Sequence, residues 1–260
     1  MLNSCKLEHR REKNSRIPVM EKITSAQNSR IKAYAKLHTR KERDHTGLFL
    51  IEGEHLLEEA EKENMVETVL TDTPDQYQLK NMIEVTPEIM KKLSSNVSAI
   101  HLIGVCHKKQ MKIEAPHRLL LLDDIQDPGN FGTLIRTAVS FGFDGVVCSR
   151  DTVDLYNEKT IRSTQGAMFH MPVVYADLSA YLDDLHKDGF TVIATALRNA
   201  VPMHEIEKKE KMAFILGNEG NGVSLSLQNM ADERLFIEMN GFESLNVAVA
   251  GGIVMYQYHQ

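Results

Sequence analysis

Three glycines in the last fifth of the chain stand where a short apolar run stops. The run Met212–Leu216 is followed by Gly217, Gly220 and Gly222 in the order G-N-E-G-N-G. In dinucleotide-binding enzymes, a glycine-rich turn that follows a strand binds the phosphates, and its pattern is G-x-G-x-x-G. Here the spacing is reversed, and Glu219 would place a carboxylate beside a pyrophosphate. The loop therefore favours either a positively charged ligand or a plain tight turn.

Two other segments carry polar residues where helices are expected to begin. The turn D-P-G-N ends at Asn130, an expected N-cap, and Arg136 lies six residues later on the same broad side. Ser244 and Asn246 occupy the first turn of an otherwise apolar helix, with Ser244 as its expected cap. Capping alone would explain Asn130 and Ser244, and a surface position would explain Arg136.

Strands and helices alternate along most of the chain, which predicts an α/β fold with a parallel sheet covered on both faces. A polar stretch at 109–117 carries a proline and has no clear period, so it predicts a linker between two regions. The expected helices are 28–44, 54–64, 86–95, 128–142, 157–169 and 244–259, and the expected strands are 47–53, 66–72, 118–124, 145–149, 171–175, 190–197, 212–216 and 234–239.

The composition is that of a globular protein, with 42% hydrophobic and 25% charged residues, and no apolar run reaches the length of a membrane span. The three cysteines are far apart and form no C-x-x-C pair, which favours a reducing compartment and argues against a zinc site. We therefore expect a cytoplasmic protein that uses no metal.

Basic residues gather locally although the net charge is −6. Between Lys22 and Arg43 there are seven basic residues and one acid, Glu42. Such a run fits a solvated helix face or a phosphate-binding patch, and charge alone leaves both open. The basic residues are Lys22, Arg30, Lys32, Lys36, Arg40, Lys41 and Arg43.

Taken together, the three polar segments resemble the three motifs of the SpoU branch of the SPOUT superfamily. Its members are S-adenosylmethionine-dependent RNA ribose 2′-O-methyltransferases. The resemblance covers about Arg118 to Tyr258, with D-P-G-N-F-G-T-L-I-R-T-A, I-L-G-N-E-G-N-G-V-S and I-E-M-N-G-F-E-S-L-N in the expected order. One departure is Glu238, where the family usually has proline.

The resemblance implies a knotted carboxyl-terminal methyltransferase domain behind a small α/β RNA-substrate-binding domain. The stretch from Ile23 to Ala60, with its basic helix and a strand that ends in I-E-G, is similar to that substrate-binding domain. The expected parts are a flexible basic leader at 1–17, the RNA-binding domain at 18–108, the linker at 109–117 and the methyltransferase domain at 118–260. A homodimer is expected through the last helix, where Gly251 and Gly252 would allow close approach or serve packing within one chain.

The resemblance also assigns residues to roles. Arg136 would be either the general base or a cation that orients the target nucleotide, because a free guanidinium keeps its proton. The catalytic set is Asn130, Arg136, Glu219, Ser244 and Asn246. The residues expected around S-adenosylmethionine are Thr195, Gly217, Asn218, Gly220, Ile237, Met239 and Leu245. The expected RNA contacts are Lys32, Arg40, Lys41 and Arg43.

Several alternatives stay open at this point. The expected substrate is ribosomal RNA of the 23S type, and a transfer RNA is the second choice. Methylation of a base instead of a ribose, or a non-catalytic RNA-binding protein, would keep the same fold. A nicotinamide-dependent dehydrogenase is a further alternative, on an ordinary doubly wound fold.

Overall fold

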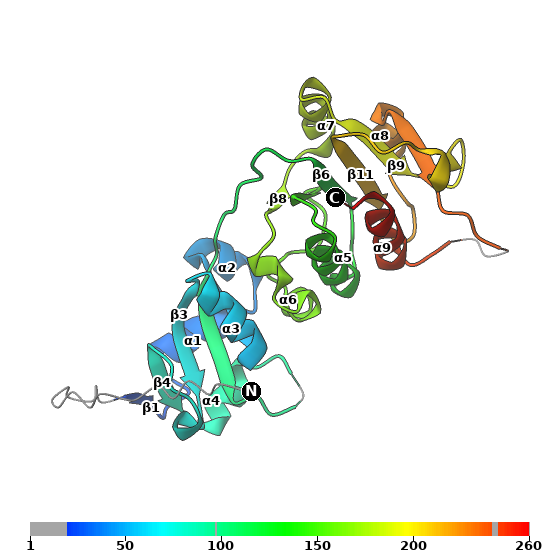
Figure 1. The fold of residues 1–260 in the computed structure, drawn as a ribbon. Coiled ribbons are helices and arrows are strands. Elements are labelled where there is room, and N and C mark those ends of the chain that lie inside the picture. Colours follow the sequence, from blue (N-terminus) through cyan, green and yellow to red (C-terminus); the bar gives the residue numbers. More distant parts are fainter. Residues whose placement is uncertain (1–19, 97, 241–243, 260) are drawn as a thin grey trace, which may run out of the picture.

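The computed structural model describes residues 20–96, 98–240 and 244–259, which form two lobes, each with its own β-sheet (Figure 1). The expected leader at 1–17 lies outside the described residues. The segment 108–117, which joins the lobes, contains no helix or strand. The strand order is β1-β4-β3-β5-β2 in the first sheet and β10-β12-β9-β11-β6-β7-β8 in the second.

The first sheet is mixed, because β5 runs antiparallel to both of its neighbours, β2 and β3, while β1, β4 and β3 pair in parallel. Helices α1 and α4 share one apolar cluster with the sheet, and α3 packs on its other side. The elements are β1 (Glu21–Ile23), α1 (Ser29–Lys36), α2 (Arg40–Thr46), β2 (Leu48–Glu52), α3 (Glu54–Lys62), β3 (Val66–Thr71), η1 (Pro74–Gln76), β4 (Met82–Val85), α4 (Pro87–Leu93) and β5 (Leu102–His107).

The second sheet has only parallel pairings among its named strands, as predicted. Its inner strand β6, next to the central strand β11, is buried on both faces: Leu120 and Leu122 face α5 and α9, while Leu119 and Leu121 face α7 and α8. The elements are β6 (Arg118–Asp123), α5 (Pro128–Ser140), β7 (Gly145–Cys148), α6 (Glu158–Thr164), η2 (Ala167–Phe169), β8 (Val173–Tyr175), α7 (Leu178–Lys187), β9 (Thr191–Thr195), β10 (Val201–Pro202), η3 (Met203–Glu205), β11 (Met212–Gly217), α8 (Leu225–Met230), β12 (Glu233–Phe236) and α9 (Val247–Tyr258).

Two predicted helices have different bounds because capping residues interrupt them. The expected helix at 28–44 divides into α1 and α2, since Thr39 is extended and its side chain accepts from the backbone N–H of Glu42. The helix expected at 157–169 ends at Thr164, because Gln165 adopts a left-handed conformation with φ of 48°.

An apolar contact joins the two lobes. The rings of Phe49 in β2 and Tyr156 lie 4.7 Å apart, and the Lys108 ammonium lies 4.6 Å from the Tyr156 ring centroid. One cluster of buried side chains runs without a break from α3 and β2 of the first lobe to α5 and α6 of the second. The lobes therefore share a core instead of meeting only through the linker.

Arg43, predicted as an RNA contact, is instead a structural residue of this junction. It is 4% exposed, and its guanidinium donates to the carbonyl of Leu37 at 2.8 Å and to the Asp154 carboxylate at 2.6 Å. A buried guanidinium that is already paired cannot reach a phosphate in solvent. The prediction for Arg43 is therefore corrected.

The Arg43–Asp154 pair can be tested by equilibrium unfolding in urea. Arg43→Ala leaves the half-buried Asp154 carboxylate without its partner, so the free energy of unfolding should fall by about 3 kcal/mol. Arg40→Ala is the matched control, because Arg40 is exposed and lies 3.7 Å from Asp44, and it should cost less than about 0.5 kcal/mol. Equal losses for the two variants would contradict the structural role of Arg43.

Candidate active site

A chain of side-chain hydrogen bonds connects the three polar segments. The Asn130 amide donates to Oε1 of Glu219 at 3.0 Å, and the Asn246 amide donates to Oδ1 of Asn130 at 3.0 Å. These residues lie at the start of α5, in the loop after β11 and at the start of α9. The predicted frame of Asn130, Glu219 and Asn246 is therefore assembled in the structure.

The caps of α5 and α9 explain how Asn130 and Asn246 come to face each other. Asp127, not Asn130, caps α5: its carboxylate accepts from the Asn130 backbone N–H at 2.8 Å. Pro128 follows at the first helical position, and because Asp127 is the cap, the Asn130 side chain is free to bind Glu219. Asn246, not Ser244, caps α9, and its Oδ1 accepts from the backbone N–H of Ala248 at 2.9 Å.

Glu219 is held as a carboxylate by several donors. Besides the Asn130 amide, the backbone N–H groups of Gln126 and Asp127 donate to it at 3.3 and 3.2 Å. Partial burial by itself would raise the pKa of Glu219, but these hydrogen bonds outweigh it, and the pKa lies below its usual value. Glu219 therefore stays ionised at neutral pH and fastens the β11 loop to the start of α5.

Gly217, the last residue of β11, allows the glycine loop to fold back on its own strand. A Cβ at this position would lie 2.0 Å from the backbone of Gly222 and Val223. Asn218 then ties the loop down, since its amide donates to the Asp124 carbonyl at 2.9 Å and its Oδ1 accepts from the Gly220 N–H at 2.9 Å. The glycines thus build a compact loop, not a phosphate cradle.

The predicted cofactor residues converge on one edge of the second sheet. Thr195 ends β9, Gly217 ends β11 and Ile237 follows β12, and these three strands are neighbours with the same direction. Carboxyl ends of parallel strands are a common position for ligand sites. Leu245 precedes the cap of α9 and is 37% exposed, and Ile237 and Met239 are half-buried.

This edge suits S-adenosylmethionine by the chemistry of its residues. Partly exposed apolar side chains at Ile237, Met239 and Leu245 offer contact to an adenine, and the ionised Glu219 is compatible with a sulfonium. When bound, S-adenosylmethionine supplies a methyl group activated by positively charged sulfur. Glu238, at the position where the family usually has proline, points away to pair with His204 at 2.7 Å.

Arg136 and Ser244 are not joined to the frame. Arg136 is exposed on α5, about 9 Å along the helix axis from Asn130. Within the described part of the chain, its guanidinium makes no hydrogen bond or ion pair. Ser244 is exposed as well and forms no hydrogen bond with a described residue. These contacts therefore do not include the predicted hydrogen bonds by which the frame would orient Arg136.

Two further residues support the site. Asp127 caps α5 and is paired with Lys159 of α6 at 2.9 Å, and this hydrogen bond, together with the one from the Asn130 N–H, lowers the pKa of Asp127. The pattern D-P-G, with proline at the first helical position, was a sequence signal for this cap. Lys159 is distant in the sequence and had no such signal.

Two family models match this chain. The model of the SpoU rRNA Methylase family matches residues 117–256, and the model of the MRM3-like substrate binding domain matches residues 28–104. The chain belongs to the SpoU rRNA methylase family. Membership confirms the predicted family and removes the dehydrogenase alternative.

One relative of this SpoU protein is the 23S rRNA (guanosine(2553)-2'-O)-methyltransferase RlmP of Bacillus subtilis (strain 168). It is 42% identical over 246 residues, which cover 91% of this chain and 98% of RlmP. A solved structure of an AdoMet-bound rRNA methyltransferase from Sinorhizobium meliloti has a TM-score of 0.83 and 26% identity, covering 92% of this chain and 97% of that one.

A second solved structure, an RNA 2'-O ribose methyltransferase, has a TM-score of 0.78 and 28% identity, covering 91% of this chain and 97% of that one. These likenesses confirm the predicted fold class, a parallel α/β methyltransferase domain behind a smaller α/β domain. Among the described residues, no helix of this SpoU protein is long and apolar enough to cross a membrane.

The folded-back loop of this SpoU site can be tested by glycine substitution. Gly217→Ala should lower the free energy of unfolding by about 3 kcal/mol and weaken S-adenosylmethionine binding, because the new Cβ meets backbone that cannot move away. Gly220→Ala is the matched control for stability, since its Cβ would meet only the Asn218 Oδ1, at 3.5 Å. Thermal unfolding and calorimetric titration report the two effects, and a stable Gly217→Ala protein would contradict the packing described.

Proposed function

We propose that this SpoU protein transfers a methyl group from S-adenosylmethionine to a ribose 2′-hydroxyl in 23S-type ribosomal RNA. The observation that carries the proposal is the hydrogen-bonded frame of Asn246, Asn130 and Glu219, which unites the three motif segments. A relative at 42% identity bears the name of a 23S rRNA 2'-O-methyltransferase, which supports this substrate class over transfer RNA. We place this activity in the cytoplasm.

Methyl transfer is an in-line displacement, so positioning supplies much of the acceleration. Bound at this edge, S-adenosylmethionine would give its methyl group to the ribose oxygen and leave as the neutral thioether, and the hydroxyl proton would pass to water. The frame keeps α5, the β11 loop and α9 in fixed relation, and thereby fixes the edge where the donor and the ribose meet. Asn130 and Glu219 serve here as positioning residues.

Arg136 acts in this proposal as a cation that holds a phosphate of the target nucleotide. Its guanidinium is exposed and makes no ion pair with a described carboxylate, so it is available to an RNA phosphate. A guanidinium in water keeps its proton, which disfavours Arg136 as the general base.

We propose a homodimer through α9. This helix is apolar on every side, yet Val249 and Tyr256 are 52% and 64% exposed. A helix of this composition is expected to be covered on both faces. Gly251 serves packing within the chain, because a Cβ there would lie 2.4 Å from Leu134, whereas Gly252 has nothing closer than 4.0 Å and stays available to a second copy.

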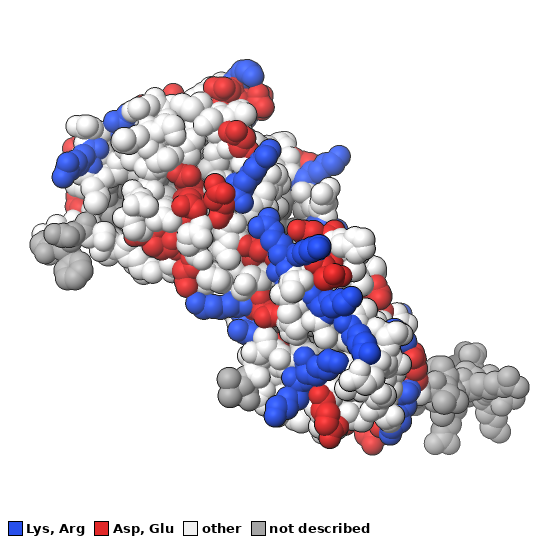
Figure 2. All heavy atoms as spheres, turned by 180° about the vertical axis from the view of Figure 1, so that it is seen from behind, with Lys and Arg blue, Asp and Glu red and all other residues white. Residues whose placement is uncertain are grey.

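The first lobe supplies the proposed RNA-binding surface, and we retain residues 18–108 as the RNA-binding domain, 109–117 as the linker and 118–260 as the methyltransferase domain. Two separate sheets and two family models support this division. Lys32, Arg40 and Lys41 are exposed on α1 and α2. Figure 2 shows that Lys and Arg side chains gather on the rear face of this lobe.

Arg136→Ala should reduce methyl transfer by at least about 100-fold, while S-adenosylmethionine affinity and the unfolding temperature stay at the wild-type values. Arg136→Lys retains the charge and should keep a measurable part of the rate. The readout is mass-spectrometric mapping of ribose methylation in 23S rRNA from cells that lack the gene and carry either variant. Methylation at the wild-type level by Arg136→Ala would show that Arg136 takes no part in the reaction. Equal ribose methylation of 23S rRNA in cells with and without the gene would refute the proposed function.

Replacing Lys32, Arg40 and Lys41 together with alanine should weaken RNA binding and reduce its salt dependence. The slope of log affinity against log salt should fall by about 2 to 3, since each lost phosphate contact removes roughly one unit. Replacing Lys187, Lys208 and Lys209, three exposed lysines of the second lobe, makes the matched control. Equal slopes for the two triple variants would indicate that Lys32, Arg40 and Lys41 belong to a solvated helix surface and do not bind RNA.

A further inference from the structure

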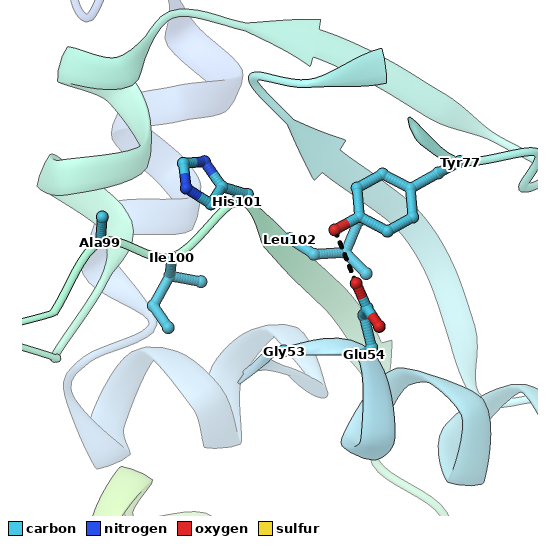
Figure 3. Close-up of a pocket in the computed structure, with 7 residues that line it drawn as sticks. All are labelled: Gly53, Glu54, Tyr77, Ala99, Ile100, His101 and Leu102. Atoms are coloured by element: carbon cyan, nitrogen blue, oxygen red, sulfur yellow. Dashed lines mark hydrogen bonds between the residues drawn. The ribbon is translucent and has the colours of Figure 1, made fainter. Parts of the chain in front are cut away.

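The first lobe contains a cavity that lies away from the methyltransferase edge. Its volume is about 310 Å³, and it opens at the end of the first sheet where β2 and β3 finish and β5 begins (Figure 3). The lining residues are Gly53, Glu54, Tyr77, Ala99, Ile100, His101 and Leu102. The predicted I-E-G turn, which the methyltransferase site leaves unexplained, forms one border of this cavity.

Two aromatic rings border the cavity, and a carboxylate holds each of them. The Tyr77 hydroxyl donates to Oε1 of Glu54 at 2.8 Å, and His101 Nδ1, as its protonated nitrogen, donates to Oδ1 of Asp72 at 2.8 Å. In Figure 3, Tyr77 and Glu54 lie on one side of the cavity, with Ala99 and Ile100 on the other. The His101 side chain is 52% exposed, so its ring is open to a ligand.

The I-E-G turn fixes the rim in advance. The Glu52 carboxylate accepts from the Ser94 hydroxyl at 2.9 Å and from the Ser95 backbone N–H at 2.7 Å, which holds the end of α4 against the I-E-G turn. Gly53 has a φ of 93°, and a Cβ on it would meet nothing within 4 Å, so it gives the cavity an open border. These contacts hold the I-E-G turn at the border of the cavity.

The chemistry of the lining selects the ligand. Ala99, Ile100 and Leu102 are apolar, the rings of Tyr77 and His101 line the cavity, and neither lysine nor arginine is among the lining residues, so a phosphate does not fit. Glu54 uses Oε1 for Tyr77, and its Oε2 has no partner among the described residues and can accept another hydrogen bond. A flat ring with an amino group on its edge meets these conditions.

We propose that this cavity binds one unpaired base of the RNA substrate, and that the base carries an exocyclic amino group, as adenine, cytosine and guanine do. Stacking on Tyr77 and His101 provides the affinity, and Glu54 Oε2 accepts from the amino group. The proposal rests on the proposed RNA methyltransferase function and adds an anchor for the substrate at a distance from the reacting ribose.

The kinetic test uses the full chain and protein-free 23S rRNA from cells that lack the gene. Tyr77→Ala removes a stacking ring, and Ala99→Phe fills the cavity without removing a contact. Each should raise the KM for RNA about 10-fold with kcat and S-adenosylmethionine affinity little changed. Tyr77→Phe should stay near wild type, because it keeps the ring.

Tyr181→Ala is the matched control for Tyr77→Ala and should leave the KM for RNA unchanged, since Tyr181 is likewise a half-buried tyrosine but lies on α7 of the second lobe. An unchanged KM in both Tyr77→Ala and Ala99→Phe would overturn the proposal while the methyltransferase function stands. An effect seen with 50S particles but not with protein-free rRNA would also overturn it, because the ligand would then be a side chain of a ribosomal protein.

A direct binding test separates this proposal from the proposed function. Titration of the full chain with AMP, CMP and UMP, followed by NMR signals of the His101 ring, needs no methyl transfer. AMP and CMP should shift these signals and UMP should shift them less, and Ala99→Phe should abolish the shifts. Equal shifts for all three nucleotides, or none, would refute the amino-edge recognition even if wild-type protein methylates rRNA.

Discussion

The amide of Asn130 is the constraint on which the methyltransferase edge depends. Its nitrogen donates to Glu219 and its oxygen accepts from Asn246, so both hydrogen-bonding ends of one short side chain are used. A leucine of the same size would satisfy neither partner, and the ionised Glu219 would lose one of its donors. Glu219 lies in the loop after β11, and Asn246 caps α9. The Asn130 side chain therefore holds together two segments that are each more than 80 residues away from it in the sequence.

Helix α6 extends this order to the first lobe. Lys159 pairs with the Asp127 cap of α5, while the neighbouring Glu158 accepts from His38 of the first lobe. The hydrogen bond that His38 donates to Glu158 raises the pKa of His38, and the same contact lowers the pKa of Glu158. Adjacent residues of one short helix therefore contact the methyltransferase site on one side and the first lobe on the other.

Much of this arrangement was accessible from the sequence. Apolar runs such as Leu119–Leu122 predicted buried parallel strands, and three motifs in order predicted Asn130, Glu219 and Asn246 as a group. The caps were assigned less well, because Asp127 and Asn130, or Ser244 and Asn246, are equally good capping residues by type. Arg43 was placed on the surface because a run of charge does not show which member turns inward, and its partner Asp154 lies 111 residues away.

The shared core at the junction, with Phe49 packed on Tyr156 and Arg43 buried against Asp154, gives the two lobes one fixed separation. In the proposed function, this separation would set the distance between the two contacts that the RNA makes. An RNA that occupies both lobes at once must offer its anchoring nucleotide and its reactive sugar at one matching span, whatever bases lie between. Selectivity would then depend on the folded shape of the RNA, and a loop lengthened by a nucleotide would present the wrong ribose.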